Sequence, residues 1–276
     1  MLNPFSEFDW DLRYYRLDRN LEPIWDELVG LSRGASALVL VPEYFGNRLS
    51  ITALDLLHEL HGSGSRIVED WTHSVISPRR APVDMAIASL RKTLPVGDGA
   101  WAWGFSGGQS LLPKTSSPGT EMWAGMDLLA LAGDQRDRAL ARKRIRRAES
   151  RFAVELEPAF ATARTQVELM RLNFSSFGAA RVRNARHLMR RLKGYEIVNH
   201  EIESDVPSHV VLRVKHPHAL QRMLAQRNVY CPVHWERPAW LPETFPWDSL
   251  ISIPIDHRYD EDDMTYVATT LNALHD

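Results

Sequence analysis

Residues 37–70 read ALVLVPEYFGNRLSITALDLLHELHGSGSRIVED and contain a complete strand–helix–strand pattern. The apolar run 37–41 predicts a buried strand, and apolar residues at helical spacing predict a helix over 49–61 that two glycines end. The run 66–70 predicts a second short strand whose last two residues are acidic. Strands that alternate with helices in this way are typical of a mostly parallel sheet.

The same pattern continues toward the C-terminus. Residues 85–89 (MAIAS) predict a third strand, and residues 100–105 predict a fourth after the turn at 95–99 (PVGDG). We therefore predict an α/β fold with a mostly parallel sheet flanked by helices. Open sheets of this class bind ligands at the carboxyl ends of their strands, which makes Asp70 and Ser89 candidate site residues.

The second half of the chain has a different organisation. Residues 121–192 are predicted to be mainly helical, and a basic run between 136 and 147 is interpreted as the solvent-facing side of that region. After Gly194 the elements become short, and they predict a small C-terminal α/β lobe. Its expected elements are strands over 210–214 and 251–255 and helices over 218–227 and 262–274.

Composition narrows the class of protein further. The chain has 276 residues, of which 44% are apolar and 25% charged, and these values predict a folded globular protein. A net charge of −2 gives nucleic acid no overall electrostatic reason to bind. The single cysteine, Cys231, allows neither an intramolecular disulfide nor a cysteine-rich metal site, and we predict no metal. No signal peptide or membrane-spanning run is recognisable, so we expect a soluble cytoplasmic protein without a membrane partner.

Lys92 lies three residues after Ser89, directly behind the predicted third strand. Burial in a cleft and the neighbouring charge of Arg91 would favour the neutral amine, which can form a Schiff base. The hydroxyl of Ser89 could donate to a phosphate. Taken alone, the Ser-x-x-Lys pattern is a weak signal, and an ordinary loop lysine is its more common explanation.

Three segments together resemble a known family. They are 44–46 (YFG), 67–74 (IVEDWTHS) and 88–99 (ASLRKTLPVGDG), and they resemble the central part of fold-type I pyridoxal phosphate aminotransferases, in particular the DegT/DnrJ/EryC1/StrS family. Two further segments, 229–235 (VYCPVHW) and 253–259 (IPIDHRY), resemble the C-terminal lobe of the same family.

The resemblance implies a role for each of four residues. Lys92 would form the internal aldimine with pyridoxal 5'-phosphate and carry protons, and Asp70 would pair with the pyridinium nitrogen. His73 would flank the ring or its oxygen, and Ser89 would contact the phosphate. From the residues alone, Asp70 could also be a cap or turn former, and His73 a polar residue at a loop mouth.

The C-terminal segments supply candidates for substrate binding. Arg258 could bind a substrate carboxylate, because a planar guanidinium suits bidentate recognition. It could also form a structural ion pair with Asp256 or Asp260. His234 and Trp235 could line the substrate entrance, while Trp235 could also simply pack the lobe.

The resemblance also implies a domain organisation. We expect a partial large cofactor-binding domain over 1–155, and a long helix with a small C-terminal domain over 156–276. Family members carry a long segment before the part that corresponds to residue 13, which supplies strands and a phosphate cradle, so we expect an N-terminally shortened version. The stretch 104–110 (GFSGGQS) differs from the family motif that reaches the partner's cofactor, so a nucleotide-sugar substrate is not expected.

Two functions remain open at this point. The first is a pyridoxal phosphate-dependent aminotransferase that transfers an amino group from an amino acid to a keto or aldehyde acceptor. The alternative is a catalytically incomplete, aminotransferase-like subunit that needs a partner chain to complete the cofactor site. Either reading predicts a homodimer or a complementing partner chain, because a sheet with an uncovered edge pairs readily with another chain.

Overall fold

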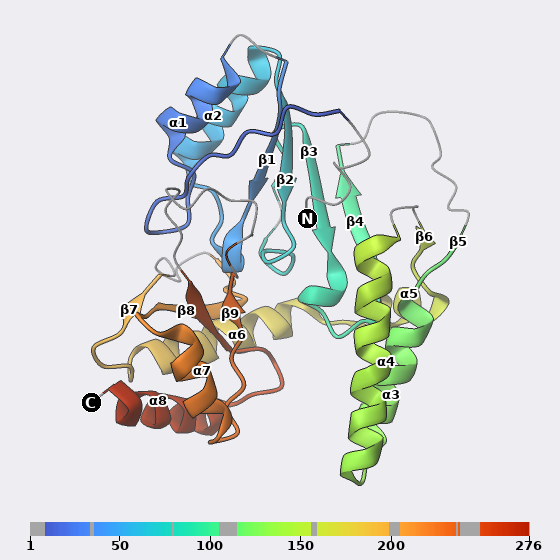
Figure 1. The fold of residues 1–276 in the computed structure, drawn as a ribbon. Coiled ribbons are helices and arrows are strands. Elements are labelled where there is room, and N and C mark those ends of the chain that lie inside the picture. Colours follow the sequence, from blue (N-terminus) through green and yellow to red (C-terminus); the bar gives the residue numbers. More distant parts are fainter. Residues whose placement is uncertain are drawn as a thin grey trace.

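The computed structural model describes residues 9–33, 36–78, 80–104, 115–155, 159–198, 205–235, 237 and 249–275. The chain forms two lobes, each with its own sheet, and the carboxyl ends of the first three strands point toward the smaller lobe (Figure 1). None of the described helices has the length and apolar run that a bilayer crossing requires.

The large lobe is formed around a four-stranded sheet of order β1-β2-β3-β4. The first three strands pair in parallel, and β4 is antiparallel to β3, so the predicted mostly parallel sheet is confirmed. The predictions for β2 and β3 match the structure, while the described part of the fourth strand ends two residues early. The strands are β1 (Leu38–Pro42), β2 (Arg66–Asp70), β3 (Met85–Ser89) and β4 (Ala100–Trp103).

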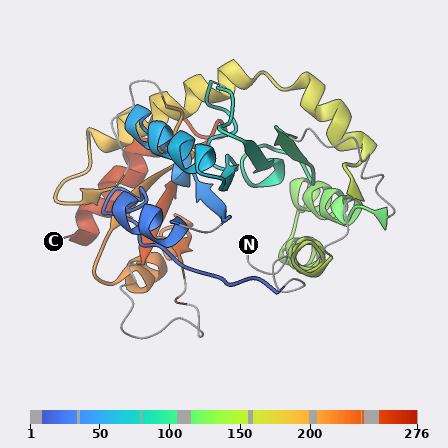
Figure 2. The same ribbon diagram turned by 90° about the horizontal axis from the view of Figure 1, so that it is seen from above.

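Helices α1 (Trp25–Ser32) and α2 (Ile51–Gly62) lie side by side against this sheet (Figure 2). The hydroxyl of Ser50 caps α2 by accepting a hydrogen bond from the Ala53 amide at 3.2 Å. The apolar stripe of α2 then packs on alternate residues of the strands, which fixes the register of the sheet. The core of this region consists of Leu28, Val39, Val41, Leu57, Leu60 and Ile67.

The stretch predicted to be mainly helical is divided into four helices. Helices α3 (Gly119–Leu131) and α4 (Gln135–Val154) form a hairpin that projects from the body (Figure 1). The predicted basic run lies on α4 with its side chains exposed, as expected for a solvated face. Two short strands, β5 (Thr115–Ser116) and β6 (Ala159–Phe160), pair beside this hairpin before α5 (Ala163–Arg171) and α6 (Phe174–Met189) follow.

The turn between β3 and β4 is anchored to these helices by one buried carboxylate. Asp98 is 1% exposed and accepts hydrogen bonds from the Thr162 amide at 2.9 Å and the Ser117 hydroxyl at 2.5 Å. It also accepts from the hydroxyl of Thr165, which in turn accepts from the indole of Trp123 at 3.0 Å. A buried charge is tolerated when it is fully hydrogen-bonded in this way.

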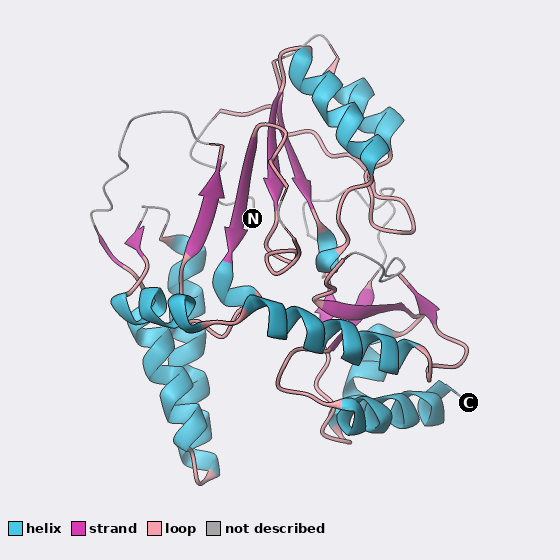
Figure 3. Cartoon of the chain, turned by 180° about the vertical axis from the view of Figure 1, so that it is seen from behind, coloured by secondary structure: helices cyan, strands magenta, loops and turns pink. Residues whose placement is uncertain are grey.

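The small lobe has a sheet of order β7-β8-β10-β9 in which every pair is antiparallel. Helices α7 (Pro217–Ala225) and α8 (Glu261–His275) cover it together with the end of α6, which runs from α5 into this lobe (Figure 3). The predicted small α/β lobe is therefore present, and a domain boundary after residue 155 stays a prediction. The strands are β7 (Glu196–Ile197), β8 (His209–Arg213), β9 (Val233–His234) and β10 (Leu250–Pro254).

A turn after β1, η2 (Tyr44–Gly46), joins the two lobes. Phe45 is fully buried, and its carbonyl accepts a hydrogen bond from the Ser208 amide of the small lobe at 2.8 Å. Gly46 has φ +92°, and a Cβ there would lie 2.5 Å from the Val206 carbonyl oxygen. Only glycine fits both the conformation and the space.

We expect Gly46→Ala to lower the free energy of unfolding by about 2 kcal/mol or more, because it adds both backbone strain and a steric clash. Urea denaturation measures this. Gly62→Ala is the matched control: no atom lies within 4 Å of its added Cβ, so this helical position should gain a few tenths of a kcal/mol or more. Equal effects at both positions would contradict the role of Gly46.

Candidate active site

The site lies where two parallel strands end. Asp70 closes β2, Ser89 closes β3, and the Trp71 amide donates to the Ile87 carbonyl at 2.8 Å to continue the pairing. Lys92 ends the short 3-10 helix η3 (Leu90–Lys92) that follows β3. The parallel topology therefore places these polar side chains at one edge of the sheet, as the sequence predicted.

Thr72 holds the two strand ends together. Its amide donates to the Asp70 carboxylate at 2.9 Å, and its hydroxyl accepts from the Ser89 amide at 3.0 Å. Its carbonyl accepts from the Thr93 hydroxyl at 2.6 Å. Thr72 is 7% exposed, so these bonds are protected from water. Sequence reasoning did not single out this residue.

His73 is fixed by the turn that joins the lobes. Its Nδ1 accepts a hydrogen bond from the Phe45 amide at 3.0 Å, so its ring proton lies on Nε2. The two rings lie 5.3 Å apart between centroids. Burial lowers the pKa of His73 to about 4, against the opposing effect of the Asp70 charge.

The electrostatics of His73 show which residues share the site. Lys92, His234 and Arg181 each lower the pKa of His73 through their charge, while Asp70 raises it. The structure therefore brings Asp70 and His73, at the end of β2, together with Lys92, which follows β3. Ser89 joins them through Thr72, and its half-buried hydroxyl has no hydrogen-bond partner among the described residues.

The expected burial of Lys92 is wrong. Its side chain is exposed, and it forms no ion pair or hydrogen bond within the described part of the chain. Arg91 does not lie against it, because its guanidinium pairs with Glu149 at 2.5 Å and lies 4.5 Å from the ring centroid of Phe152. Lys92 is therefore not buried, and the charge of the neighbouring Arg91 is paired with Glu149 of α4.

Aromatic and histidine side chains form the wall of the site toward the small lobe. Phe45 contacts His209 and His234 with centroid separations of 6.0 and 5.2 Å. Trp235 lies 4.9 Å from the ring of Tyr44, so it packs at the lobe junction. His234 shares a hydrogen bond of 2.9 Å with the Ser252 hydroxyl. Its place beside Phe45 agrees with the predicted site, and its role at a substrate entrance stays a prediction.

Arg258 forms one of the two ion pairs considered for it. Its Nε and NH2 bind the two carboxylate oxygens of Asp256, each at 2.7 Å. Its side chain is 69% exposed and that of Asp256 15%. Binding of a substrate carboxylate by Arg258 stays a prediction.

Arg181 is a site residue that the sequence reasoning missed. It is 4% exposed, and its NH2 donates to the Thr93 carbonyl at 2.6 Å, one residue after Lys92. The sequence does contain a pattern that indicates its burial. Arg181 lies at helical spacing from Gly178, Ala185 and Leu188, which are buried on the same face of α6. An arginine on an apolar stripe indicates a charge with a specific task.

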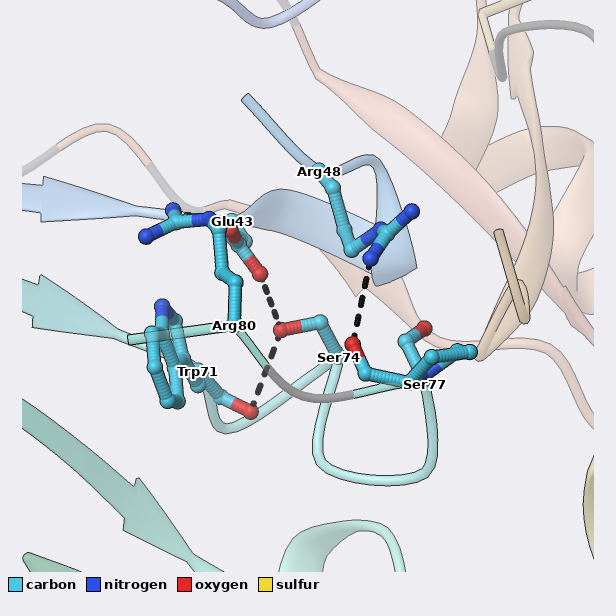
Figure 4. A pocket seen from close by; sticks show the side chains of 7 residues that line it. Glu43, Arg48, Trp71, Ser74, Ser77 and Arg80 are labelled. Atoms are coloured by element: carbon cyan, nitrogen blue, oxygen red, sulfur yellow. Dashed lines mark hydrogen bonds and ion pairs between the residues drawn. The ribbon is translucent and has the colours of Figure 1, made fainter. Parts of the chain in front are cut away.

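A small pocket lies at the turn after β2, next to the candidate site (Figure 4). Arg80, one of its lining residues, pairs with Glu43 in the pocket and with the buried Glu69 outside it, and the Ser74 hydroxyl donates to Glu43. Burial raises the pKa of Glu43. Within the described ranges no cluster of histidine, cysteine and carboxylate side chains has the arrangement of a metal site. The pocket is lined by Glu43, Arg48, Trp71, Ser74, Ser77, Pro78 and Arg80.

The buried histidines predict a pH dependence of stability. Burial lowers the pKa of His73 to about 4 and that of His209 to about 3, whereas both return to about 6.5 on unfolding. The unfolded chain therefore binds more protons below pH 6.5, and stability falls as the pH falls. We expect each histidine to reduce the free energy of unfolding by about 2 kcal/mol between pH 7 and pH 5.

Urea denaturation of the wild type and of His209→Gln across this range measures the effect. Between pH 7 and pH 5 the free energy of unfolding of the variant should fall by about 2 kcal/mol less than that of the wild type, because His209 no longer contributes. Glu43, whose raised pKa acts in the opposite direction, is present in both proteins and cancels in the comparison. Identical pH profiles would contradict the assignment.

Comparisons with known proteins place the fold. No protein-family model matches the chain, and no curated sequence is similar to it. Among solved structures, a DegT DnrJ EryC1 StrS aminotransferase from Brucella abortus matches with a TM-score of 0.61 and 13% identity. The match covers 95% of this chain and 73% of that one.

Two further solved structures have a similar fold. The PMP form of Spr1654 from Streptococcus pneumoniae, described as a sugar aminotransferase, matches with a TM-score of 0.62 and 15% identity, over 95% of this chain and 74% of that one. DesI, solved in the presence of its TDP-sugar product, matches with a TM-score of 0.59 and 15% identity, over 94% and 68% of the two chains. The chain therefore has the fold of DegT/DnrJ/EryC1/StrS aminotransferases.

Proposed function

We propose that this protein is a pyridoxal phosphate-dependent aminotransferase. It transfers an amino group from an amino acid to a keto or aldehyde acceptor. The observation that carries the proposal is the meeting of Asp70, His73 and Lys92 at one sheet edge, with Ser89 tied in through Thr72. The solved PLP and PMP forms of Spr1654, which has the same fold, support the cofactor.

The side chains at this edge fit the cofactor by their chemistry. Asp70 uses one carboxylate oxygen for the Thr72 amide and keeps the other for a ring nitrogen. His73 has its proton on Nε2, since Nδ1 is occupied by the Phe45 amide. The Ser89 hydroxyl suits a phosphate oxygen, and the unpaired amine of Lys92 suits a carbonyl carbon.

Each residue then has a defined task. Pyridoxal phosphate supplies an electron sink when its ring nitrogen is protonated. Asp70, held in place by Thr72, keeps that proton on the ring. Neutral His73 lies against the ring without adding a positive charge that would compete with it. The Nζ of Lys92, on an exposed turn, would take up the proton released from the α-carbon of the amino donor and would return it to the carbonyl carbon of the acceptor as that carbon gains the amino group.

The competing proposal is that the chain needs a partner chain to complete the cofactor site. The exposure of Lys92 favours it, because a reacting amine works best when it is shielded from water. A second copy in a homodimer or a complementing polypeptide would each provide such a shield. In both proposals the substrates are a small amino donor and a small carbonyl acceptor, in the cytoplasm.

Lys92→Ala tests the assignment of the amine. We expect the purified chain with added pyridoxal phosphate to show a visible absorbance band that borohydride reduces, with the modification mapped to Lys92. The variant should lose this band and remain folded. Lys143→Ala, on the exposed face of α4, is the matched control and should retain it. A band that persists in Lys92→Ala would overturn the assignment, and no band in the folded wild type would favour the partner-dependent proposal.

Asp70→Asn tests the electrostatic role. The amide keeps the shape and can still accept the Thr72 hydrogen bond, but it removes the charge that stabilises a protonated ring nitrogen. We expect turnover to fall by about a hundredfold or more, the range of a lost acid–base function, with a much smaller change in cofactor affinity. Rates measured at saturating cofactor separate the two effects. Unchanged turnover would remove Asp70 from the site.

A further inference from the structure

Arg181 carries a buried charge that is only partly satisfied. Its NH2 donates to the Thr93 carbonyl, but its Nε and NH1 are buried and have no hydrogen-bond partner in the described structure. Burial lowers the pKa of Arg181 to about 10, and the charge of Asp256 opposes this effect. Unsatisfied buried donors are costly, so an arginine in this state indicates that a partner is available in some other arrangement.

Asp256 is the carboxylate in position to be that partner. It lies close enough for Arg181 to lower its pKa, yet both of its oxygens are bound by the exposed Arg258. Its backbone is fixed to α6, because Asn184, one turn after Arg181, donates to the carbonyls of Asp256 and Tyr259 at 3.2 and 2.9 Å. Asp256 is therefore held beside the turn of α6 that carries Arg181, and the movement that the exchange requires is a rotation of the Asp256 side chain.

We propose that Asp256 exchanges between Arg258 and Arg181, and that this exchange frees Arg258 to bind a carboxylate of the substrate. In the structure described here Asp256 neutralises Arg258. When an anion reaches Arg258, Asp256 turns inward and satisfies the Nε and NH1 donors of Arg181. Arg181 is then a positioning residue that controls the availability of Arg258 and does not itself touch the anion.

The ligand class follows from the chemistry of the freed group. The Arg258 guanidinium gives up a bidentate carboxylate and is therefore shaped to accept another one. The identification of that carboxylate as part of the amino donor or acceptor rests on the proposed function. The exchange itself concerns only Arg181, Asp256 and Arg258, and it can be measured without cofactor or turnover.

Glutarate, a dicarboxylate that cannot transfer an amino group, is a suitable probe. Its affinity for the full chain is measured by isothermal titration calorimetry without cofactor, for the wild type, Arg181→Met, Asp256→Asn and the double variant. Arg258→Gln should lose glutarate binding. Lys143→Ala, on the exposed face of α4, should bind as the wild type does, and because the measurement uses neither cofactor nor turnover, a failure of the proposed function and a failure of the exchange are distinguishable.

The exchange predicts a specific pattern of coupling. Arg181→Met should weaken glutarate binding by about tenfold, because Asp256 then has no alternative partner and retains Arg258. Asp256→Asn should tighten binding, since nothing holds Arg258. In the Asp256→Asn background the Arg181→Met change should have no further effect. A merely structural Arg181, or one that contacts the anion, would cause the same loss in both backgrounds, and this result would overturn the proposal.

Two further measurements complete the test. If Arg181→Met does not fold, Arg181→Lys replaces it in both backgrounds, because lysine keeps the charge but lacks the planar fork that pairs with a carboxylate. It should weaken binding only where Asp256 is present. Inorganic phosphate serves as the second probe. Tighter binding of phosphate than of glutarate would show that the freed group does not select carboxylates and would also overturn the proposal.

Discussion

The candidate site depends on the three hydrogen bonds that Thr72 makes. The parallel strands β2 and β3 end at the same edge of the sheet. The turns that follow them are separate in the chain, so the strand pairing alone does not hold their side chains together. Thr72 connects Asp70 to Ser89 and Thr93, so the turn after β2 and the turn after β3 move as one body. The hydroxyl and the peptide groups of Thr72 therefore link the segment that carries Asp70 to the segment that carries Lys92.

Residues of the small lobe and of α6 also hydrogen-bond to the turns around the candidate site. The Phe45 amide fixes the ring proton of His73, and the Phe45 carbonyl is held by the Ser208 amide. Arg181 reaches across from α6 to the carbonyl of Thr93. The large lobe supplies the polar groups at the strand ends, and Ser208 and Arg181 each bind a backbone carbonyl of the turns beside them. The site at the ends of β2 and β3 is therefore in contact with residues 88 or more positions later in the sequence.

Much of this arrangement could be predicted from the sequence. The apolar runs of β2 and β3 are short and end in polar residues, so both strands were predicted with their observed bounds, and parallel topology alone brought Asp70 to Ser89. The exposure of Lys92 and the pairing of Arg91 with Glu149 could not be predicted, because both depend on how α4 and the turn after β3 are placed in three dimensions. The choice of Asp256 over Asp260 by Arg258 and the two donors of Arg181 that lack a partner could not be predicted either. Such contacts leave no periodic pattern to detect.

The turn at η2 has a mechanical consequence for the molecule. Phe45 is enclosed by side chains of both lobes, and Gly46 leaves no room for a Cβ beside the Val206 carbonyl. The lobes therefore cannot draw apart along a straight line without first emptying the cavity that Phe45 fills. Separation of the lobes would bring the Phe45 ring into water, which costs about 1.5–3 kcal/mol for a side chain of this size. It would also break the ion pair of Arg48 with Asp205 and the hydrogen bond from the Val206 amide to Ser77, so the lobes are held at several neighbouring points.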